Sequence, residues 1–133
     1  LLDASFDRFI NEFDEDLSGR RQAHAPRYTA NFGASVTSGN WRVQVDADLK
    51  DEFFYSDRHH VKSNSDYTLL NASAHWQIGS VDLRLWARNL TDEDYSVRAF
   101  GSFGNDPRKG YVTEPYFQWG EPRMIGANIT LNW

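Results

Sequence analysis

The sequence has no cysteine, no long apolar run and no excess of basic residues. Without cysteine, disulfides and thiolate metal sites are excluded. No stretch approaches the roughly 18 consecutive apolar residues of a membrane-spanning helix, so a transmembrane helix is excluded too. Acidic residues outnumber basic ones by 19 to 14, for a formal net charge of -5. This balance argues against nucleic acid as a partner, because phosphate binding needs a basic surface.

The beginning of the chain also lacks two features. The first residues, LLDASFDRF, contain no initiator methionine and no positively charged segment followed by an apolar one, so no signal peptide is visible. We therefore expect the chain to begin inside a longer protein. Its 133 residues make at most one ordinary domain. Aromatic residues are 15% of the chain, which is many for so polar a sequence.

What the sequence does contain is alternation of apolar and polar residues, which is the period of a β-strand. No helical stripe with a period of 3.6 residues competes with it. The alternation predicts six strands, within residues 1–7, 27–36, 41–50, 69–78, 81–89 and 124–133. In the last of these the apolar side consists of Ile125, Ala127, Ile129, Leu131 and Trp133.

The connections between these segments alternate between short and long. Thr37–Asn40 and Gly79–Ser80 are typical of tight hairpin turns. The other connections, 12–25, 56–66 and 96–120, are long. An up-and-down sheet with its short turns at one end produces this pattern, as in outer-membrane barrels with short periplasmic turns. Trp133 then lies at the short-turn end.

Alternation alone does not separate a soluble β-sandwich from a membrane barrel. Strands of about ten residues suit a tilted membrane crossing, and the predicted apolar faces carry no charge through their middle. Aromatic residues near the strand ends predict interfacial girdles: Tyr28, Trp41, Trp76 and Trp133 on the turn side, and Phe53, Phe54, Tyr55 and Tyr67 on the loop side. Six open strands would leave unsatisfied edges in lipid, so more strands are needed to close a barrel.

Two motifs near the C-terminus carry a family resemblance. Asn89, Leu90, Thr91 and Asp92 are followed by Tyr95, and Gly120–Arg123 reads Gly-Glu-Pro-Arg before a last strand that ends in an aromatic residue, Trp133. The stretch Ala25–Val36 opens with Ala-Pro-Arg-Tyr. Together these segments resemble the C-terminal end of TonB-dependent outer-membrane receptors.

The resemblance implies an all-β fold: an antiparallel, up-and-down transmembrane β-barrel segment, about six strands of a 22-stranded barrel. Residues 1–133 would be the C-terminal part of that barrel, without the N-terminal plug domain and without the TonB box. It also implies active uptake of a scarce nutrient, such as an iron–siderophore complex, across the outer membrane of a Gram-negative bacterium. The implied partners are outer-membrane lipid, the plug and remaining strands of the same receptor, the TonB complex and the barrel-assembly machinery.

Candidate sites lie in the predicted loops and the last strand. Aromatic residues of the last long loop could stack on a sugar or catechol ring, and two arginines of the first loop could meet an anionic ligand: Tyr111, Tyr116, Phe117, Trp119, Arg20 and Arg21. The resemblance implies an assembly signal in the last strand, formed by Ile125, Ile129, Leu131 and Trp133. Adjacent His59 and His60 are expected to be solvated loop residues. No catalytic residues, metal ligands or cofactor are predicted, and we expect no enzyme.

Two other functions remain open on the sequence. A small passive outer-membrane channel built by oligomerisation predicts a genuine start at Leu1 and a stable oligomer in detergent. A soluble β-sandwich that binds carbohydrate predicts solubility without detergent and glycan affinity through the loop aromatics.

Overall fold

The chain folds into antiparallel β-strands and one short 3-10 helix, as the computed structural model shows for residues 4–11, 14–56, 66–101, 106–112 and 114–132. The strands are β1 (Thr29–Ser38), β2 (Trp41–Lys50), β3 (Tyr67–Ile78), β4 (Val81–Arg88), β5 (Ser96–Gly101), β6 (Pro115–Trp119) and β7 (Met124–Leu131). The helix η1 is Pro107–Lys109. The all-β, antiparallel fold class is therefore confirmed. Within the described ranges, no helix is long and apolar enough to cross a membrane.

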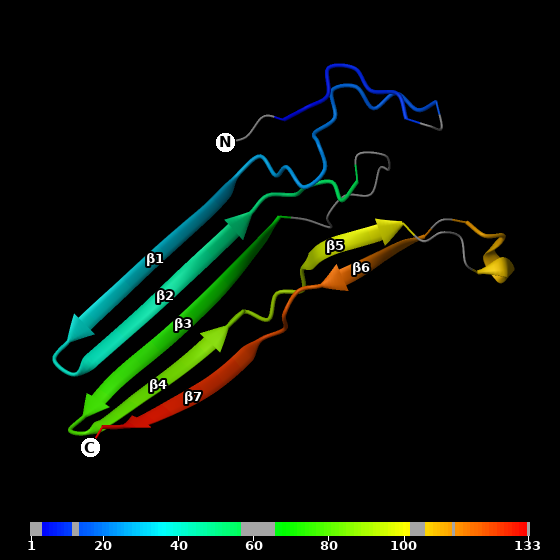
Figure 1. The fold of residues 1–133 in the computed structure, drawn as a ribbon. Coiled ribbons are helices and arrows are strands. Elements are labelled where there is room, and N and C mark those ends of the chain that lie inside the picture. The colour runs from blue at the N-terminus through cyan, green and yellow to red at the C-terminus, as the bar shows by residue number, and fades with distance from the viewer. Residues whose placement is uncertain (1–3, 12–13, 57–65, 102–105, 113, 133) are drawn as a thin grey trace. The chain divides into compact units, whose positions relative to one another are not determined.

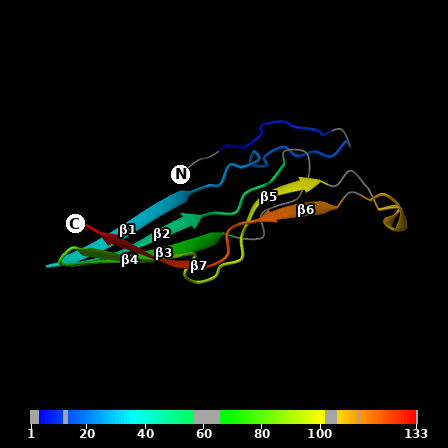
Figure 2. The same cartoon turned by 60° about the horizontal axis from the view of Figure 1, so that its bottom comes forward.

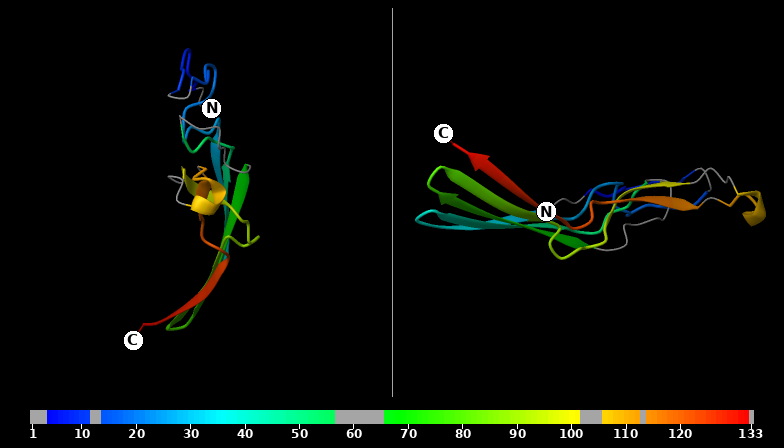
Figure 3. Two further views of the ribbon diagram at one scale, coloured as in Figure 1. Left: turned by 90° about the vertical axis from the view of Figure 1, so that its right-hand side faces the viewer. Right: turned by 90° about the horizontal axis from the view of Figure 1, so that it is seen from below.

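The chain divides into two compact units. We call Ala30–Lys50, Tyr67–Asp94 and Glu121–Trp133 the sheet unit, and Leu1–Thr29, Asp51–Asp66 and Tyr95–Gly120 the loop unit. The sheet unit holds five strands in the order β1-β2-β3-β4-β7, so β1 and β7 are its two edges (Figure 1). Figure 3 shows that this sheet is curved, with β7 bending away from the plane of its neighbours.

Two-residue turns connect the hairpins of the sheet, as predicted. Gly39 and Gly79 occupy the first turn positions with φ angles of 55° and 58°. Glycine adopts positive φ without a steric cost, which allows so short a reversal between twisted strands. The backbone N–H of Asn132 donates to the Ser80 carbonyl at 2.8 Å, so the chain after β7 lies beside the β3–β4 turn. The last strand thus ends at the short-turn end of the sheet.

The register aligns the apolar residues of neighbouring strands on one face. Val43 lies opposite Ala74, which lies opposite Leu85, and Leu85 lies opposite Ala127. This face is not covered by protein in the described residues. Large side chains on it are between 44% and 73% exposed: Trp41, Val43, Val45, Ile78, Leu85, Ile125, Ile129 and Leu131. Near the turn end, the stacked rings of Trp41 and Trp76 have centroids 4.7 Å apart.

The loop unit contains a second, two-stranded sheet formed by β5 and β6 (Figure 2). The buried apolar residues of the chain's described part also belong to this unit: Leu17, Phe53, Phe54 and Tyr55. The ring centroid of Tyr55 lies 5.1 Å from that of Phe53 and 5.8 Å from that of Phe117. The Tyr55 hydroxyl also bonds to Ser96 at the start of β5. Aromatic packing therefore joins 53–55 to the β5–β6 hairpin.

Three sequence-based expectations need correction. No strand forms in the described part of 1–7: Ser5 makes an isolated bridge with Arg21, and the backbone bonds beside it, Phe6 N–H to Arg20 and Gln22 N–H to Ala4, do not extend into a ladder. Phe53, Phe54 and Tyr55 are not an exposed girdle, since their rings are at most 8% exposed inside the loop unit.

The third correction concerns Tyr28. This residue precedes β1, and its carbonyl accepts from the N–H of Asp51, just after β2. It therefore lies at the loop end of these strands and not at the turn end, because β1 runs from its start at Thr29 towards the turn after Ser38.

Candidate functional site

The polar face of the sheet unit bears the side chains that alternate with the exposed apolar ones. A hollow of about 370 Å³ opens on this face, and its lining comes from four strands: Gln44, Asp46, Asn71, Ala72, Ser73, Arg84, Trp86, Ala87, Arg88 and Asn128. Carboxylate, amide, hydroxyl, guanidinium and indole groups meet here. Such a surface can hydrogen-bond water, a polar solute or another polar protein surface.

Trp86 is the large aromatic residue of this polar face. It lies directly opposite Gly126 of β7 in the register. A Cβ atom at Gly126 would lie 2.3 Å from Cζ2 of the indole, so the ring covers the glycine backbone closely. The indole N–H donates to Asn128 Oδ1 at 2.9 Å. Gly126 thus leaves room for the apolar ring, and Asn128 binds the indole N–H. The covering of a strand glycine by an aromatic ring on the next strand is known as aromatic rescue of glycine.

Most of the polar-face carboxylates are engaged by neighbouring amides. Asp48 accepts from the amide of Asn31 and, at 3.3 Å, from that of Asn71. Asp46 accepts from Gln44 at 3.0 and 3.1 Å. Amide hydrogen bonds, across strands at Asp48 and within β2 at Asp46, therefore satisfy these carboxylates without a cationic partner.

A row of three nitrogen-bearing side chains crosses the same face. The register places Arg42 opposite His75, and His75 opposite Arg84. These three residues, with Gln44 and Ser73, line a hollow of about 350 Å³. His75 Nε2 lies 3.2 Å from Asp82 Oδ1, which also orients the imidazole. Two guanidinium groups of the polar face thus flank one imidazole.

Asn89 connects the end of β4 to the start of β7. It is 3% exposed and adopts a left-handed φ of 47°. Its amide N–H groups donate to the carbonyls of Glu93 at 2.9 Å and Glu121 at 3.0 Å, while its Oδ1 accepts from the Glu93 N–H at 2.8 Å. Its own backbone N–H donates to Asn71 Oδ1 at 3.1 Å. One buried side chain thereby ties three chain segments together.

Asp92 extends this connection to the second motif. Its Oδ1 accepts from the Arg123 N–H at 2.9 Å, and its Oδ2 lies 3.7 Å from the Arg123 guanidinium. The Asn-Leu-Thr-Asp and Gly-Glu-Pro-Arg motifs are therefore hydrogen-bonded to each other. Sequence reasoning used both motifs as family markers and did not predict this contact, because their separation of about 30 residues gives no sign of which backbone groups meet.

The predicted loop aromatics divide between two faces of the β5–β6 hairpin. Phe117 and Trp119 alternate with Tyr116 along β6, and their ring centroids lie 6.2 Å apart. Phe117 is half-buried against Tyr55, whereas Trp119 is 55% and Tyr116 58% exposed. Tyr111 follows η1 with a φ of 59° and is 65% exposed. The structure therefore brings Phe117 and Trp119 together on one face of β6 and places Tyr116 on the other.

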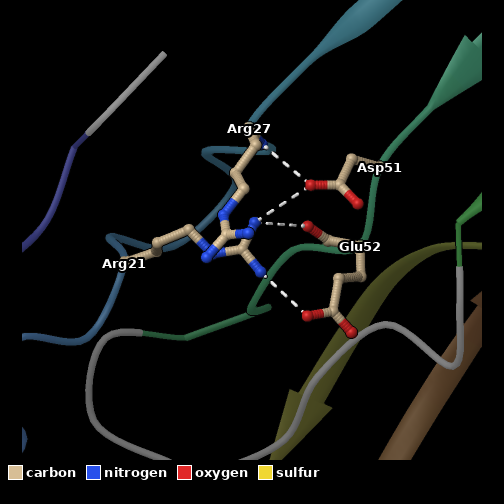
Figure 4. A network of polar contacts seen from close by, with 4 residues as sticks. All are labelled: Arg21, Arg27, Asp51 and Glu52. Carbon is tan, nitrogen blue, oxygen red and sulfur yellow. Dashed lines mark hydrogen bonds and ion pairs between the residues drawn. The ribbon is translucent and has the colours of Figure 1, made fainter. Parts of the chain in front are cut away.

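The predicted arginines of the first loop are held by protein groups. The Arg21 guanidinium is 3.2 Å from Asp51 and 2.9 Å from Glu52, and it also donates to the Glu52 carbonyl (Figure 4). The Arg27 N–H donates to the same Asp51 carboxylate. Arg20 lies over the Phe54 ring, 4.7 Å from its centroid, and donates to the Ser56 carbonyl. The charge of Arg21 is thus offset by two carboxylates.

Two loop groups have shifted pKa values. The carboxylate of Glu114, 2.6 Å from Nζ, raises the pKa of Lys109 above its usual range. Hydrogen bonds from the Ser18 hydroxyl and N–H lower the pKa of the Asp16 carboxyl. Among the described residues, no group of three or more His, Asp or Glu side chains is arranged to hold a metal ion. His59 and His60 lie outside the described residues.

The residues expected to carry the assembly signal lie along the outer edge strand. Ile125, Ile129 and Leu131 of β7 share the apolar face and are 73%, 68% and 59% exposed. Trp133 lies outside the described residues. A continuous exposed apolar row on an edge strand can contact lipid or another protein, and its role as a signal stays a prediction.

A family model described as "TonB dependent receptor-like, beta-barrel" matches residues 2–90. The matched region runs from the first loop through β1, β2, β3 and β4 to the Asn89-Leu90 pair. No solved structure matches the chain significantly.

Proposed function

The chain belongs to the family of TonB-dependent receptor β-barrels, and from this premise we propose that it forms part of the wall of an outer-membrane receptor that imports a scarce nutrient. Residues 1–133 supply strands near the C-terminus of the barrel, and other parts of the receptor supply the remaining strands and the plug. The receptor acts as a transporter, and no catalytic step is assigned to it.

The observation that carries this proposal is the contrast between the two faces of the sheet. One face presents large apolar side chains that are exposed along all five strands, including Phe32, Val45 and Ile125. The other face presents hydrogen-bonded amides and charges. Membrane barrels place apolar residues towards lipid and polar residues towards the lumen. We therefore assign the apolar face to lipid and the polar face to the barrel interior.

Cysteine scanning of β2 tests this assignment. In the whole receptor, in a background without other accessible cysteines, Val45→Cys and Gln44→Cys place a thiol on adjacent residues of opposite faces. We expect a lipid-soluble maleimide to label position 45, and a small water-soluble maleimide to label position 44. Equal labelling of both thiols by the water-soluble reagent would contradict the membrane assignment.

We further propose that the transported substrate is an iron–siderophore complex and that the β5–β6 hairpin contacts it. Exposed aromatic rings suit stacking on the planar rings of such chelates. The candidate contacts are Tyr111, Tyr116, Phe117 and Trp119, and Arg20 and Arg21 would border them within the loop unit. Trp119 offers the largest exposed ring, supported on one side by Phe117.

Ligand binding to the purified receptor tests the hairpin assignment. Trp119→Ala should weaken binding of a ferric catecholate siderophore by about threefold to tenfold, the range expected for a lost aromatic contact. Gln118→Ala, a substitution at the neighbouring non-aromatic residue of β6, is the matched control and should leave binding unchanged. If neither the wild-type receptor nor its variants bind the chelate, while the intact cell still needs the receptor for growth on another nutrient, the siderophore assignment fails and the transport role survives.

The partners follow from the same proposal. The plug domain would occupy the barrel interior, the TonB complex would act through the N-terminal part of the receptor, and the barrel-assembly machinery would read the last strand, with Ile125, Ile129, Leu131 and Trp133 as its signal. The site of action would be the outer membrane of a Gram-negative bacterium.

A further inference from the structure

Arg42 and Arg84 differ from the other charged residues on the polar face. Asp46 and Asp48 accept hydrogen bonds from amides, and Asp82 contacts His75 and Asn132. Arg88 lies 3.8 Å from Glu121 and over the Trp86 ring. The guanidinium group of neither Arg42 nor Arg84 forms a hydrogen bond or ion pair with any other residue that the structure describes. Two guanidinium groups thus remain unpaired on a face where neighbouring charges are satisfied.

The register concentrates this unpaired charge at one place. Arg42 and Arg84 lie on either side of His75, on successive strands and in the same row. Directly opposed side chains in an antiparallel sheet have Cβ atoms only about 4.5–5.5 Å apart, so both guanidinium groups flank the same imidazole from neighbouring strands. An anion bound over His75 could therefore contact both guanidinium groups.

The hollow over this row is suited to a carboxylate. Its volume of about 350 Å³ is lined by Arg42, Gln44, Ser73, His75 and Arg84, all of which can donate hydrogen bonds. Arginine binds carboxylates in a charge-assisted, bidentate manner. Asp82 is not among the residues that line this hollow, and its carboxylate is already shared by His75 Nε2 and the Asn132 amide.

We propose that Arg42, His75 and Arg84 form a docking site for an acidic side chain of the receptor's own plug domain. The proposal rests on the assignment of the polar face to the barrel interior. The hollow is open, so a dissolved anion there would remain partly solvated and would be held weakly. A carboxylate presented by a domain packed in the barrel has a much higher effective concentration. Charge complementarity and this tethering favour the plug as the occupant.

Calorimetry of the whole receptor tests this docking site. In Arg42→Gln/Arg84→Gln, the unfolding transition of the plug should fall by about 2–8 °C at low salt. The shift should shrink at high salt, where exposed charges are screened. Arg42→Lys/Arg84→Lys keeps the positive charges, so its plug should unfold at nearly the wild-type temperature. The matched control Arg108→Gln removes one exposed arginine paired with Asp106 in the loop unit and should not move it.

Each result decides the proposal. An unchanged plug transition in the glutamine variant, with an unchanged barrel transition, would overturn it. A dissolved anion as the occupant would also overturn the proposal. In that case phosphate would raise the unfolding temperature of the wild-type receptor more than chloride does at equal ionic strength. The glutamine variant would lose this difference, while its plug transition would stay the same. If the double glutamine variant does not fold, Arg84→Gln alone serves: a salt-dependent fall of the plug transition supports the site, and an unchanged plug transition overturns it. Cysteine labelling of positions 44 and 45 separately reports whether the interior assignment has failed.

Discussion

Two glycines of this chain lie directly beneath aromatic rings. Gly126 lies under Trp86 in the sheet unit, and Gly120 lies under Tyr95 in the loop unit, where a Cβ would be 2.0 Å from Cζ of the ring. The Gly120 N–H also donates to the Tyr95 carbonyl at 2.7 Å. In both places the missing side chain makes room for a ring that covers the backbone, so the glycine and the aromatic residue act as one unit.

Gly126→Ala tests this coupling. The added methyl group would force the Trp86 ring away and should cost about 1–3 kcal/mol of unfolding free energy, as overpacking does. The measurement is the urea unfolding midpoint of the receptor folded into lipid vesicles. Gly33→Ala is the matched control, because its Cβ would meet only the flexible end of Asp46. An equal loss for both variants would contradict the proposed ring–glycine unit.

Asn89 is the other residue on which local structure depends. Asn89→Ala should cost about 1–3 kcal/mol, because it leaves the Glu93 N–H and two carbonyls without their partner. Asn89→Gly should be less damaging than Asn89→Ala, since glycine tolerates the left-handed φ. The same urea midpoints measure both. Asn132→Ala, which removes an exposed amide bonded to Asp82, should have a small effect, and a loss as large as that of Asn89→Ala would refute the special role of Asn89.

At the scale of elements, five of the six predicted strands are present close to their expected bounds. Their alternation is long enough to dominate local propensity, and their turns contain glycine in the required positions. The β5–β6 hairpin was missed inside a predicted loop, because its pairing is irregular between Ser96 and Arg98 and its strands are short. The first predicted strand is absent from the described residues, where isolated bridges replace a ladder.

A charge placed on either face of the strands tests their orientation. Leu85 is 49% exposed, so Leu85→Arg would be nearly neutral if this face met water. If the face meets lipid, the arginine should cost about 2–4 kcal/mol near the midplane and reduce the yield of folded receptor. Gln44→Arg on the polar face is the control and should fold normally. Heat-modifiable mobility of receptor from outer membranes gives the folded fraction, and equal yields would argue against lipid contact.

At the scale of the whole molecule, the five-stranded sheet is open. Among the described strands, β1 and β7 each have one backbone edge that pairs with no other strand. In lipid, such edges must be satisfied by further strands, because unpaired N–H and C=O groups there cost several kcal/mol each. If the proposed membrane assignment holds, the sheet therefore needs neighbouring strands on both sides, which the other strands of the receptor barrel would supply.

Residues 1–133 expressed alone test this requirement. We expect them to associate or aggregate in detergent, because the backbone N–H and C=O groups of both edge strands lack partners. The whole receptor should be monomeric. Light scattering with detergent correction measures the mass. A stable, monodisperse oligomer that conducts ions in bilayers would favour the passive-channel alternative, and a soluble monomer without detergent would favour the β-sandwich alternative.

The sequence by itself determined which segments are strands, which residues share a face and which end of the sheet carries the turns. These properties are local, because the pleat sends successive side chains to opposite faces. The tertiary structure decided which residues meet across strands: Trp86 with Gly126, Asn89 with Glu121, and Arg42 with His75 and Arg84. These contacts depend on strand order and register, which bring together residues tens of positions apart, and a linear pattern does not specify such pairings.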